Sequence, residues 1–195
     1  MANQAPAPTL FLLSPATLHG QRAQELAAPR AAFPTALRFR SPEGLPIGEA
    51  FAFLSSLYFR GKIAYARRFA SAPADLDGGI FVIAPGVGLV PPEWTLTPER
   101  LEQLKETPVD PKSQAYARPL RAAARELAER LPEGSRAVLL GSIATPKYTG
   151  VLAPVLRHRL LFPACFAGAG DMRRGALLLR AARSGEELEY AGVPA

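Results

Sequence analysis

Hydroxyl groups and a lysine stand together in the segment GSIATPKYTG, residues 141–150, between two apolar runs. A loop that enters a helix offers free backbone N–H groups and the positive end of the helix dipole, so it favours an anion such as phosphate. The segment lacks the G-x-x-x-x-G-K-[ST] order of a phosphate loop, and it also fits a turn whose Ser or Thr caps the next helix. Its candidate ligand-binding residues are Ser142, Thr145, Lys147 and Tyr148.

The segment GAGDMRRG, residues 168–175, combines glycines, an acid and two adjacent arginines. Glycines let a ligand approach the backbone, and Asp171 is a candidate general base. Arg173 and Arg174 could clamp a phosphate, but only one of them points inward if the backbone is extended. The alternative is an exposed loop before a strand, in which Asp171 caps a turn.

Two further loops carry candidate ligand-binding residues. They are Ser14 and Arg22 in residues 14–22, and Gly86, Gly88 and Trp94 in residues 85–94. An indole ring in a loop can stack on a base, because every nucleobase has a π-face. The aromatic residues Tyr58, Phe59 and Tyr65 follow a helical stripe instead, so we expect them in the core.

A serine and a histidine that lie close in sequence, Ser14 and His19, suggest a nucleophile and its base. No G-x-S-x-G elbow surrounds the serine, and neither a third catalytic member nor an oxyanion loop is visible. Cys165 is expected to be a small buried residue. A small-molecule hydrolase that uses Ser14 or Cys165 is therefore a hypothesis that stands behind the two given below.

Four short apolar runs have the character of buried strands: residues 9–13, 79–84, 136–140 and 159–162. They are apolar throughout rather than alternating, which is typical of strands covered on both faces of a parallel sheet. The four candidate loops follow the carboxyl ends of these runs, and in an open parallel sheet ligands bind beyond those ends. We therefore expect the four loops to meet at one edge of the sheet.

Helical patterns separate the strands. Residues 48–70 place apolar side chains at helical spacing, with Arg60 and Lys62 between the apolar positions and Gly61 as the point where the helix kinks or divides. Residues 119–130 predict an amphipathic helix that starts at its proline, and residues 147–157 predict a helix that a proline disturbs.

The C-terminal residues 176–193 predict two strands around Ser184-Gly185, a β-hairpin. The whole chain, residues 1–195, is thus expected to form a single three-layer α/β domain. Its features are a mainly parallel central sheet, flanking helices and a C-terminal β-hairpin.

Composition narrows the class of protein. The 195 residues are 48% hydrophobic and 21% charged, as in a soluble globular domain with a sizeable core. No apolar run approaches the roughly 18 residues that span a bilayer, and the first residues lack the basic region of a secretory signal, so we expect a cytoplasmic protein without a membrane partner. One cysteine and two histidines argue against zinc, iron–sulfur and histidine-rich centres, so neither a metal nor a cofactor is predicted.

The net charge of +6 is unevenly distributed along the chain. Basic residues outnumber acidic ones by eight to three in residues 1–74 and by eight to four in residues 136–195, whereas acidic residues lead by ten to seven between these ranges. Such a balance favours nucleic acid or nucleotides as partners. An arginine-rich composition without a clustered patch would give the same total.

The stretches LYFRGKIAYARRFA (57–70), FVIAPGVGLVPP (81–92) and VLLGSIATPKYTGVLAPVL (138–156) form a pattern. The pattern resembles a family of uncharacterised phage and bacterial domains, in which an LY…YA helix leads to a buried strand, a glycine-containing loop and a proline-rich turn. Such domains are similar in layout to the uracil-DNA-glycosylase-like α/β group, where nucleobase chemistry occurs at strand ends. Neither a GQDPYH-like nor an HPSP-like loop occurs here, so the resemblance implies no catalytic residue.

The first functional hypothesis is an α/β protein that binds a nucleotide, a nucleobase or a nucleic-acid strand at these loops. As an enzyme it would act on a nucleobase or its glycosidic bond, with Asp171 as the base or water-positioning group. Lys147 with Arg173 or Arg174 would hold phosphate, and Trp94 would stack on the base. The alternative is a non-catalytic basic module or scaffold in a stress or DNA-maintenance complex, and residue types leave open whether the chain is an enzyme.

Overall fold

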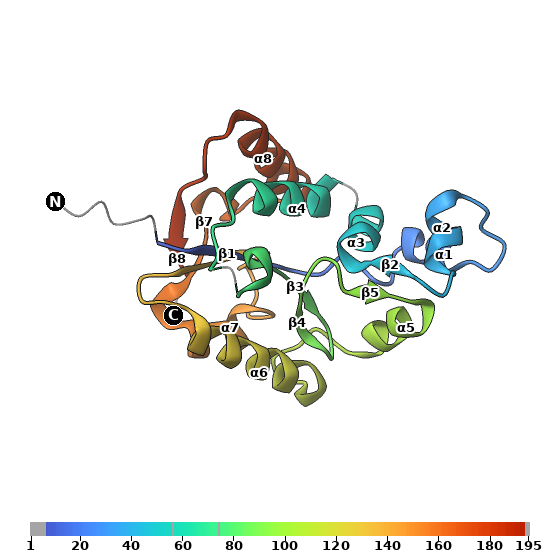
Figure 1. The fold of residues 1–195 in the computed structure, drawn as a ribbon, viewed down its shortest axis with the longest axis horizontal. Helices are drawn as coiled ribbons and strands as arrows, with labels where there is room; N and C mark the ends of the chain where they lie inside the picture. The colour runs from blue at the N-terminus through green and yellow to red at the C-terminus, as the bar shows by residue number, and fades with distance from the viewer. Residues whose placement is uncertain (1–6, 56, 74, 194–195) are drawn as a thin grey trace.

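A six-stranded sheet forms the centre of the computed structural model, which describes residues 7–55, 57–73 and 75–193 (Figure 1). Four strands run parallel: β1 (Thr9–Leu13), β3 (Ile80–Ala84), β6 (Arg136–Leu140) and β7 (Leu160–Pro163). Two strands pair antiparallel at the edges, β4 (Gly88–Val90) and β8 (Tyr190–Gly192), which gives the order β4-β3-β1-β6-β7-β8. The predicted α/β class with a mainly parallel sheet is confirmed, and the four apolar runs are its parallel strands.

Helices cover both faces of the sheet, so the sheet is the middle of three layers (Figure 1). One face carries α4 (Leu57–Phe69) and α8 (Asp171–Ser184), and the other carries α6 (Gln114–Arg130) and α7 (Thr149–Leu156). Successive residues of a strand point to opposite faces. Phe11 and Leu13 therefore pack in the core beside α4 and α8, whereas Leu10 and Leu12 pack beside α6 and α7. Burial on both sides explains why β1 is almost entirely apolar.

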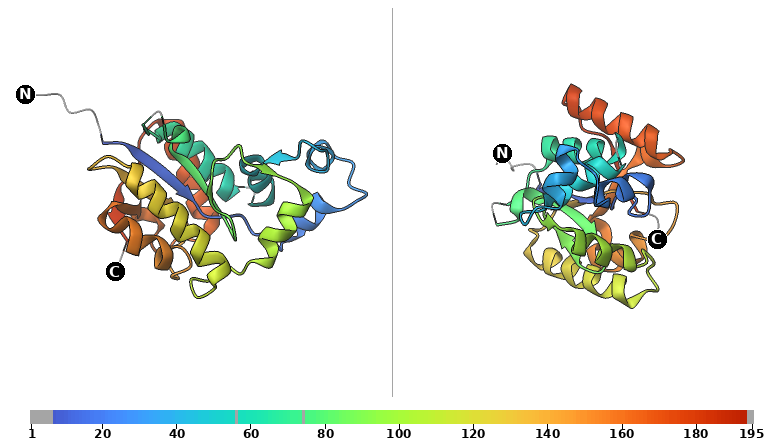
Figure 2. Two further views of the ribbon diagram at one scale, coloured as in Figure 1. Left: turned by 60° about the horizontal axis from the view of Figure 1, so that its bottom comes forward. Right: turned by 90° about the vertical axis from the view of Figure 1, so that its right-hand side faces the viewer.

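The remaining elements gather at one end of the molecule, beyond the carboxyl end of β1 (Figure 2). They are α1 (Gln21–Ala27), α2 (Pro34–Phe39), α3 (Ile47–Ser55), α5 (Pro98–Glu106) and a small antiparallel sheet of β2 (Leu45–Pro46) and β5 (Thr95–Leu96). Short 3₁₀ turns lie at η1 (Asp77–Gly79), η2 (Arg157–Arg159) and η3 (Ala164–Phe166). No helix in the described ranges is long and apolar enough to cross a membrane.

The sequence predicted that the helix would kink or divide at Gly61, and this prediction is wrong. Helix α4 (Leu57–Phe69) runs through Gly61 without a break. A Cβ atom on Gly61 would lie only 2.8 Å from the carbonyl oxygen of Gly175 in α8. The glycine is there because α4 and α8 approach each other closely at that point.

The predicted C-terminal hairpin is wrong in its first strand. Residues 171–184 form α8, whose buried face includes Leu178 and Ala181, and Gly185 ends the helix in a left-handed conformation with φ 76°. The expected hairpin turn is therefore a helix C-cap. The antiparallel C-terminal pair exists, but β8 pairs with β7 across the intervening helix.

The two proline-containing helices also differ in detail from the prediction. Pro119 lies inside α6, which begins at Gln114, rather than at its first position. Pro154 lies inside α7, which continues to Leu156.

The strand order reverses at β1. From β1 the chain crosses to β3 on one side, and later returns to β6 on the other side of β1. In open parallel sheets, such a reversal opens a crevice at the carboxyl ends of the two strands, and ligands bind there. We therefore expect a ligand site among the residues that follow Leu13 and Leu140.

Candidate functional site

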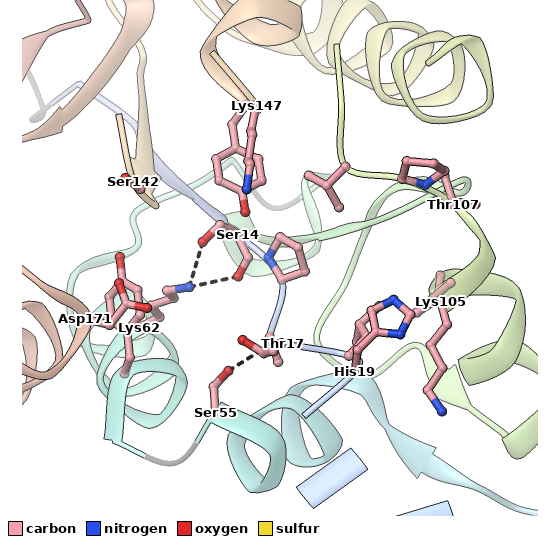
Figure 3. A pocket seen from close by; sticks show the side chains of 18 residues that line it. Ser14, Thr17, His19, Ser55, Lys62, Lys105, Thr107, Ser142, Lys147 and Asp171 are labelled. Carbon is pink, nitrogen blue, oxygen red and sulfur yellow. Dashed lines mark hydrogen bonds between the residues drawn. The ribbon is translucent and has the colours of Figure 1, made fainter. Parts of the chain in front are cut away.

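A pocket of about 560 Å³ lies at the carboxyl ends of β1 and β6, within the size range of small-molecule sites (Figure 3). The backbone N–H of Ser14 donates to the carbonyl of Leu140 at 3.2 Å, which joins the two strand ends. The lining comes from five parts of the chain: Ser14–His19, the α3–α4 region, the α5–α6 loop, the loop after β6, and the start of α8. The predicted meeting of loops at one edge thus holds for the segments after β1 and β6 and for the start of α8.

Lys62 of α4 points into this pocket from below (Figure 3). Its side chain is buried, with only 1% of the residue exposed. Its Nζ donates to the Ser14 Oγ at 2.7 Å and to the Ser14 carbonyl oxygen at 2.9 Å. The same Nζ lies 4.0 Å from the ring centroid of Tyr58, close enough for a cation–π contact.

Burial lowers the pKa of Lys62 to about 7, because the protein interior disfavours the ammonium ion. The charge of Asp171 opposes this shift and that of Arg174 adds to it. Within the described residues Lys62 has no carboxylate within ion-pair distance. At neutral pH the amine therefore exists as a mixture of its charged and neutral forms.

Ser14 is held closely by its neighbours. It is only 4% exposed, and a Cβ atom on Gly141 would lie 3.0 Å from the Ser14 Cβ. A larger residue at this position would press against Ser14. Burial raises the pKa of Tyr148, which lines the pocket beside Ser14.

The Tyr58 hydroxyl is buried without a hydrogen-bond partner among the described residues. The residue is 8% exposed and lines the pocket beside Lys62. Buried polar groups almost always have a partner.

Three further charged side chains of the pocket lining are Lys147, Lys105 and Asp171. Lys147 is exposed, and its backbone carbonyl accepts a hydrogen bond from the Tyr116 hydroxyl at 3.0 Å, which fixes the loop after β6. Lys105 forms an ion pair with Glu102 at 2.7 Å. The side chain of Asp171 is 71% exposed and lies 3.4 Å from Arg174.

Five residues named from the sequence line the pocket together: Ser14, Ser142, Lys147, Tyr148 and Asp171. They come from three separate segments, and the strand order explains why those segments meet. His19 also lines the pocket, but the contact to the Ser14 hydroxyl is made by Lys62.

The other named residues lie outside the pocket. Arg22 donates to the carbonyl of Phe53 at 2.9 Å, and Trp94 is covered by the guanidinium of Arg100, 4.6 Å from the indole ring. Gly86 and Gly88, with φ 78° and 116°, shape the turn between β3 and β4. Because β4 turns back antiparallel to β3, the loop that carries Trp94 is led away from the strand ends.

The arginine pair after the glycines does not form a clamp. Arg174 is turned inward, where it donates to the carbonyl of Phe166 at 3.2 Å, and Arg173 is exposed on α8. The two side chains point in different directions because both residues lie in the helix α8, not in an extended segment. Thr145 lies in a neighbouring shallow hollow, and Cys165 is exposed, not buried as predicted.

Lys62, Tyr58 and Ser55 were not predicted as site residues. Lys62 follows Tyr58 by four residues and precedes Ala66 by four, so all three lie on the buried face of α4 and not between its apolar positions. A lysine among the apolar positions of a helix is the feature of the sequence that could have identified Lys62 as a site residue. Its partner in the pocket, Ser14, lies 48 residues away in the sequence.

A second hollow, of about 460 Å³, lies on the outer side of α6 and α7. Its basic lining residues are Arg121, Arg125 and Arg157. Among the described residues these three form no ion pair or hydrogen bond through their side chains. Arg157 also has a positive φ of 52°, which is unusual for a residue other than glycine.

The described residues contain no group of three or more His, Cys, Asp or Glu side chains that could hold a metal ion. In comparisons with known proteins, no family model, no curated protein and no solved structure matches the chain. The mostly parallel α/β sheet is compatible with the layout that the sequence resemblance implies. The resemblance itself stays a prediction.

Proposed function

We propose that the protein binds a nucleotide or another nucleobase-containing ligand in the pocket between the ends of β1 and β6. The observation that carries the proposal is the position of a buried amine, Lys62, and an unpaired buried hydroxyl, Tyr58, in a cavity at the reversal of strand order. The Tyr58 hydroxyl lacks a hydrogen-bond partner among the described residues, and we expect a nucleobase or a phosphate to provide one.

The charge of the lining favours an anionic ligand. Lys62, Lys105 and Lys147 line the pocket against a single carboxylate among its lining residues, Asp171. Glu102 offsets Lys105, whereas Lys147 has no side-chain partner among the described residues. We therefore assign a ligand phosphate to the rim beside Lys147.

The apolar part of the lining suits a planar ring. Leu18, Leu104 and Val109 provide aliphatic walls, and Tyr148 provides an aromatic one. Tyr148 takes the stacking role that the sequence suggested for Trp94, since the indole lies outside the pocket. If the protein acts on the base or its glycosidic bond, Asp171 at the rim is the group that would position water.

A thermal-shift screen with nucleobases, nucleoside monophosphates and short oligonucleotides at low and high salt tests this proposal. We expect a salt-sensitive rise in melting temperature with the wild type, because screening weakens phosphate contacts at an exposed rim. Lys147→Ala should abolish that rise. Arg173→Ala is the matched control, because it removes an exposed positive charge outside the pocket and should keep the rise.

Two outcomes would contradict the proposal. One is the absence of a shift for every ligand, and the other is an equal loss in Lys147→Ala and Arg173→Ala, which would indicate a non-specific charge effect.

The second candidate function is that of a non-catalytic basic module on nucleic acid, and the hollow between α6 and α7 favours it. Arg121, Arg125 and Arg157 present unpaired guanidinium groups on one surface, as expected for contacts with a phosphate backbone. Arg121→Ala/Arg125→Ala should weaken binding of a short DNA duplex and flatten its salt dependence. Unchanged affinity and salt slope would exclude this role.

A further inference from the structure

Ser14 and Lys62 contact each other more closely than either contacts any other pocket side chain for which the structure gives a distance. The amine nitrogen and the hydroxyl oxygen are 2.7 Å apart, and both residues line the pocket (Figure 3). This distance is within the range for direct proton transfer between a nucleophile and its base. The pair joins the end of β1 to the middle of α4.

The second contact of Lys62 orients its amine. The Ser14 carbonyl oxygen, 2.9 Å from Nζ, can only accept a hydrogen bond, so it takes one N–H of the amine. A neutral amine has one lone pair, which is then free to accept the proton of the Ser14 hydroxyl. Because burial lowers the pKa of Lys62 to about 7, a large fraction of the amine is neutral at physiological pH.

We propose that Ser14 and Lys62 form a nucleophile–base pair that cleaves a small carboxylic ester carrying an anionic group. Serine–lysine pairs are one of the arrangements that activate a serine without a histidine. The pocket of about 560 Å³ limits the substrate to a small molecule, and the exposed Lys147 at its rim favours an anionic group. This inference goes beyond ligand binding and uses the same pocket, but it does not require the ligand to be a nucleotide.

The reaction balances with groups of this chain and water. The Ser14 Oγ attacks the ester carbonyl carbon while its proton passes to the neutral Lys62 amine. The carbon–oxygen bond of the leaving alcohol then breaks, and the Lys62 ammonium returns the proton to that alcohol. Water, deprotonated by Lys62, then attacks the acyl carbon of the acyl-serine. The bond from that carbon to Oγ breaks, and the Lys62 ammonium returns the proton to Oγ, which releases the acid and the free serine.

Tyr148 is placed to stabilise the charge that develops in this step. Tyr148 lines the pocket with Ser14, and burial raises the pKa of its hydroxyl, so the hydroxyl keeps its proton at neutral pH. A neutral donor beside the nucleophile can hydrogen-bond to the carbonyl oxygen as that oxygen becomes negative. We assign Tyr148 as the oxyanion donor of this pair.

Covalent labelling with phenylmethylsulfonyl fluoride tests the pair without any nucleotide. The Ser14 oxygen would form a bond to sulfur, fluoride would leave, and the proton would pass to Lys62. We expect the sulfonyl group on Ser14 in peptide mass spectra, at a rate that rises with pH around 7. Ser113→Ala, which removes a serine outside the pocket, should leave labelling unchanged, and Ser14→Ala should abolish it.

Lys62→Met keeps the length of the side chain and removes the base. In a folded Lys62→Met protein the labelling rate should fall about 100-fold or more, the usual contribution of a general base. If that variant does not fold, the pH profile of the wild type decides, because a serine without a base would show no rise near pH 7. The absence of label on Ser14, a flat pH profile, or equal rates in wild type and folded Lys62→Met would overturn the proposal.

The two proposals fail separately. Labelling of Ser14 together with no nucleotide-induced thermal shift would leave the pair standing and reject nucleotide binding. A thermal shift lost in Lys147→Ala, together with an unreactive Ser14, would leave the binding proposal standing and make Lys62 a structural or ligand-contacting residue.

Discussion

Replacement of Lys62 by methionine should change how the stability of the protein depends on pH. The amine is buried and its pKa falls from 10.5 to about 7, whereas in the unfolded chain it keeps its ordinary value. Below pH 7 both states hold the proton, and the native state bears the full penalty of a buried ammonium. Between pH 7 and 10.5 the unfolded state binds more protons, so the free energy of unfolding rises with pH.

The size of this effect follows from the two pKa values. The slope approaches about 1.4 kcal/mol per pH unit once the native amine is neutral. Integration from pH 7 to pH 9 gives a gain of about 2 kcal/mol for the wild type. Lys62→Met lacks this proton and therefore lacks the gain, while the hydrogen bonds that it loses to Ser14 shift its curve by a constant amount.

Urea unfolding followed by circular dichroism at several values between pH 7 and pH 9 measures the difference. Other titrating groups act equally in both proteins, so the wild-type free energy minus that of Lys62→Met isolates the amine. A difference that grows by about 2 kcal/mol in favour of the wild type supports the reasoning. Parallel curves would show that Lys62 keeps an ordinary pKa, and would refute the account of its burial.

Three substitutions test backbone packing and strain at separate points of the fold. Gly61→Ala should cost about 2 kcal/mol in urea unfolding, because its new Cβ would lie 2.8 Å from a backbone oxygen of α8, whereas Gly192→Ala meets nothing within 4 Å and should be near neutral. Arg157→Gly should stabilise the protein by about 1 kcal/mol through relief of its positive φ of 52°, and an unchanged or lower stability would argue against strain there. Gly141→Ala should displace Ser14, 3.0 Å from the new Cβ, and slow its sulfonylation about 10-fold or more; an unchanged rate would show that the position of Ser14 is not critical.

The parallel strands could be predicted from the sequence because their physical signature is local. Residues 9–13 and 136–140 are apolar at nearly every position, which is typical of a short strand buried on both faces. The first strand of the predicted C-terminal hairpin, which falls within α8, is wrong for a related reason. The run ALLLRAA suits either a strand or a helix, and the close approach of α8 to Gly61, which selects the helix, is not visible in the local sequence.

The site could be predicted only in part. Ser14, Ser142 and Lys147 follow strand ends, so the topology of a parallel sheet brings them together. Arg174 and Trp94 also follow strand ends, but helix direction turned one inward and an antiparallel strand led the other away. Lys62 was missed because its role depends on a contact between α4 and β1 that has no counterpart in residue spacing.

The most direct test of the central claim is a crystal structure of the wild type soaked with adenosine or uridine monophosphate. The account predicts electron density in the pocket between β1 and β6, with the phosphate within hydrogen-bond distance of Lys147 and the base against Tyr148. An empty pocket at saturating nucleotide, or density only at the arginines between α6 and α7, would contradict it.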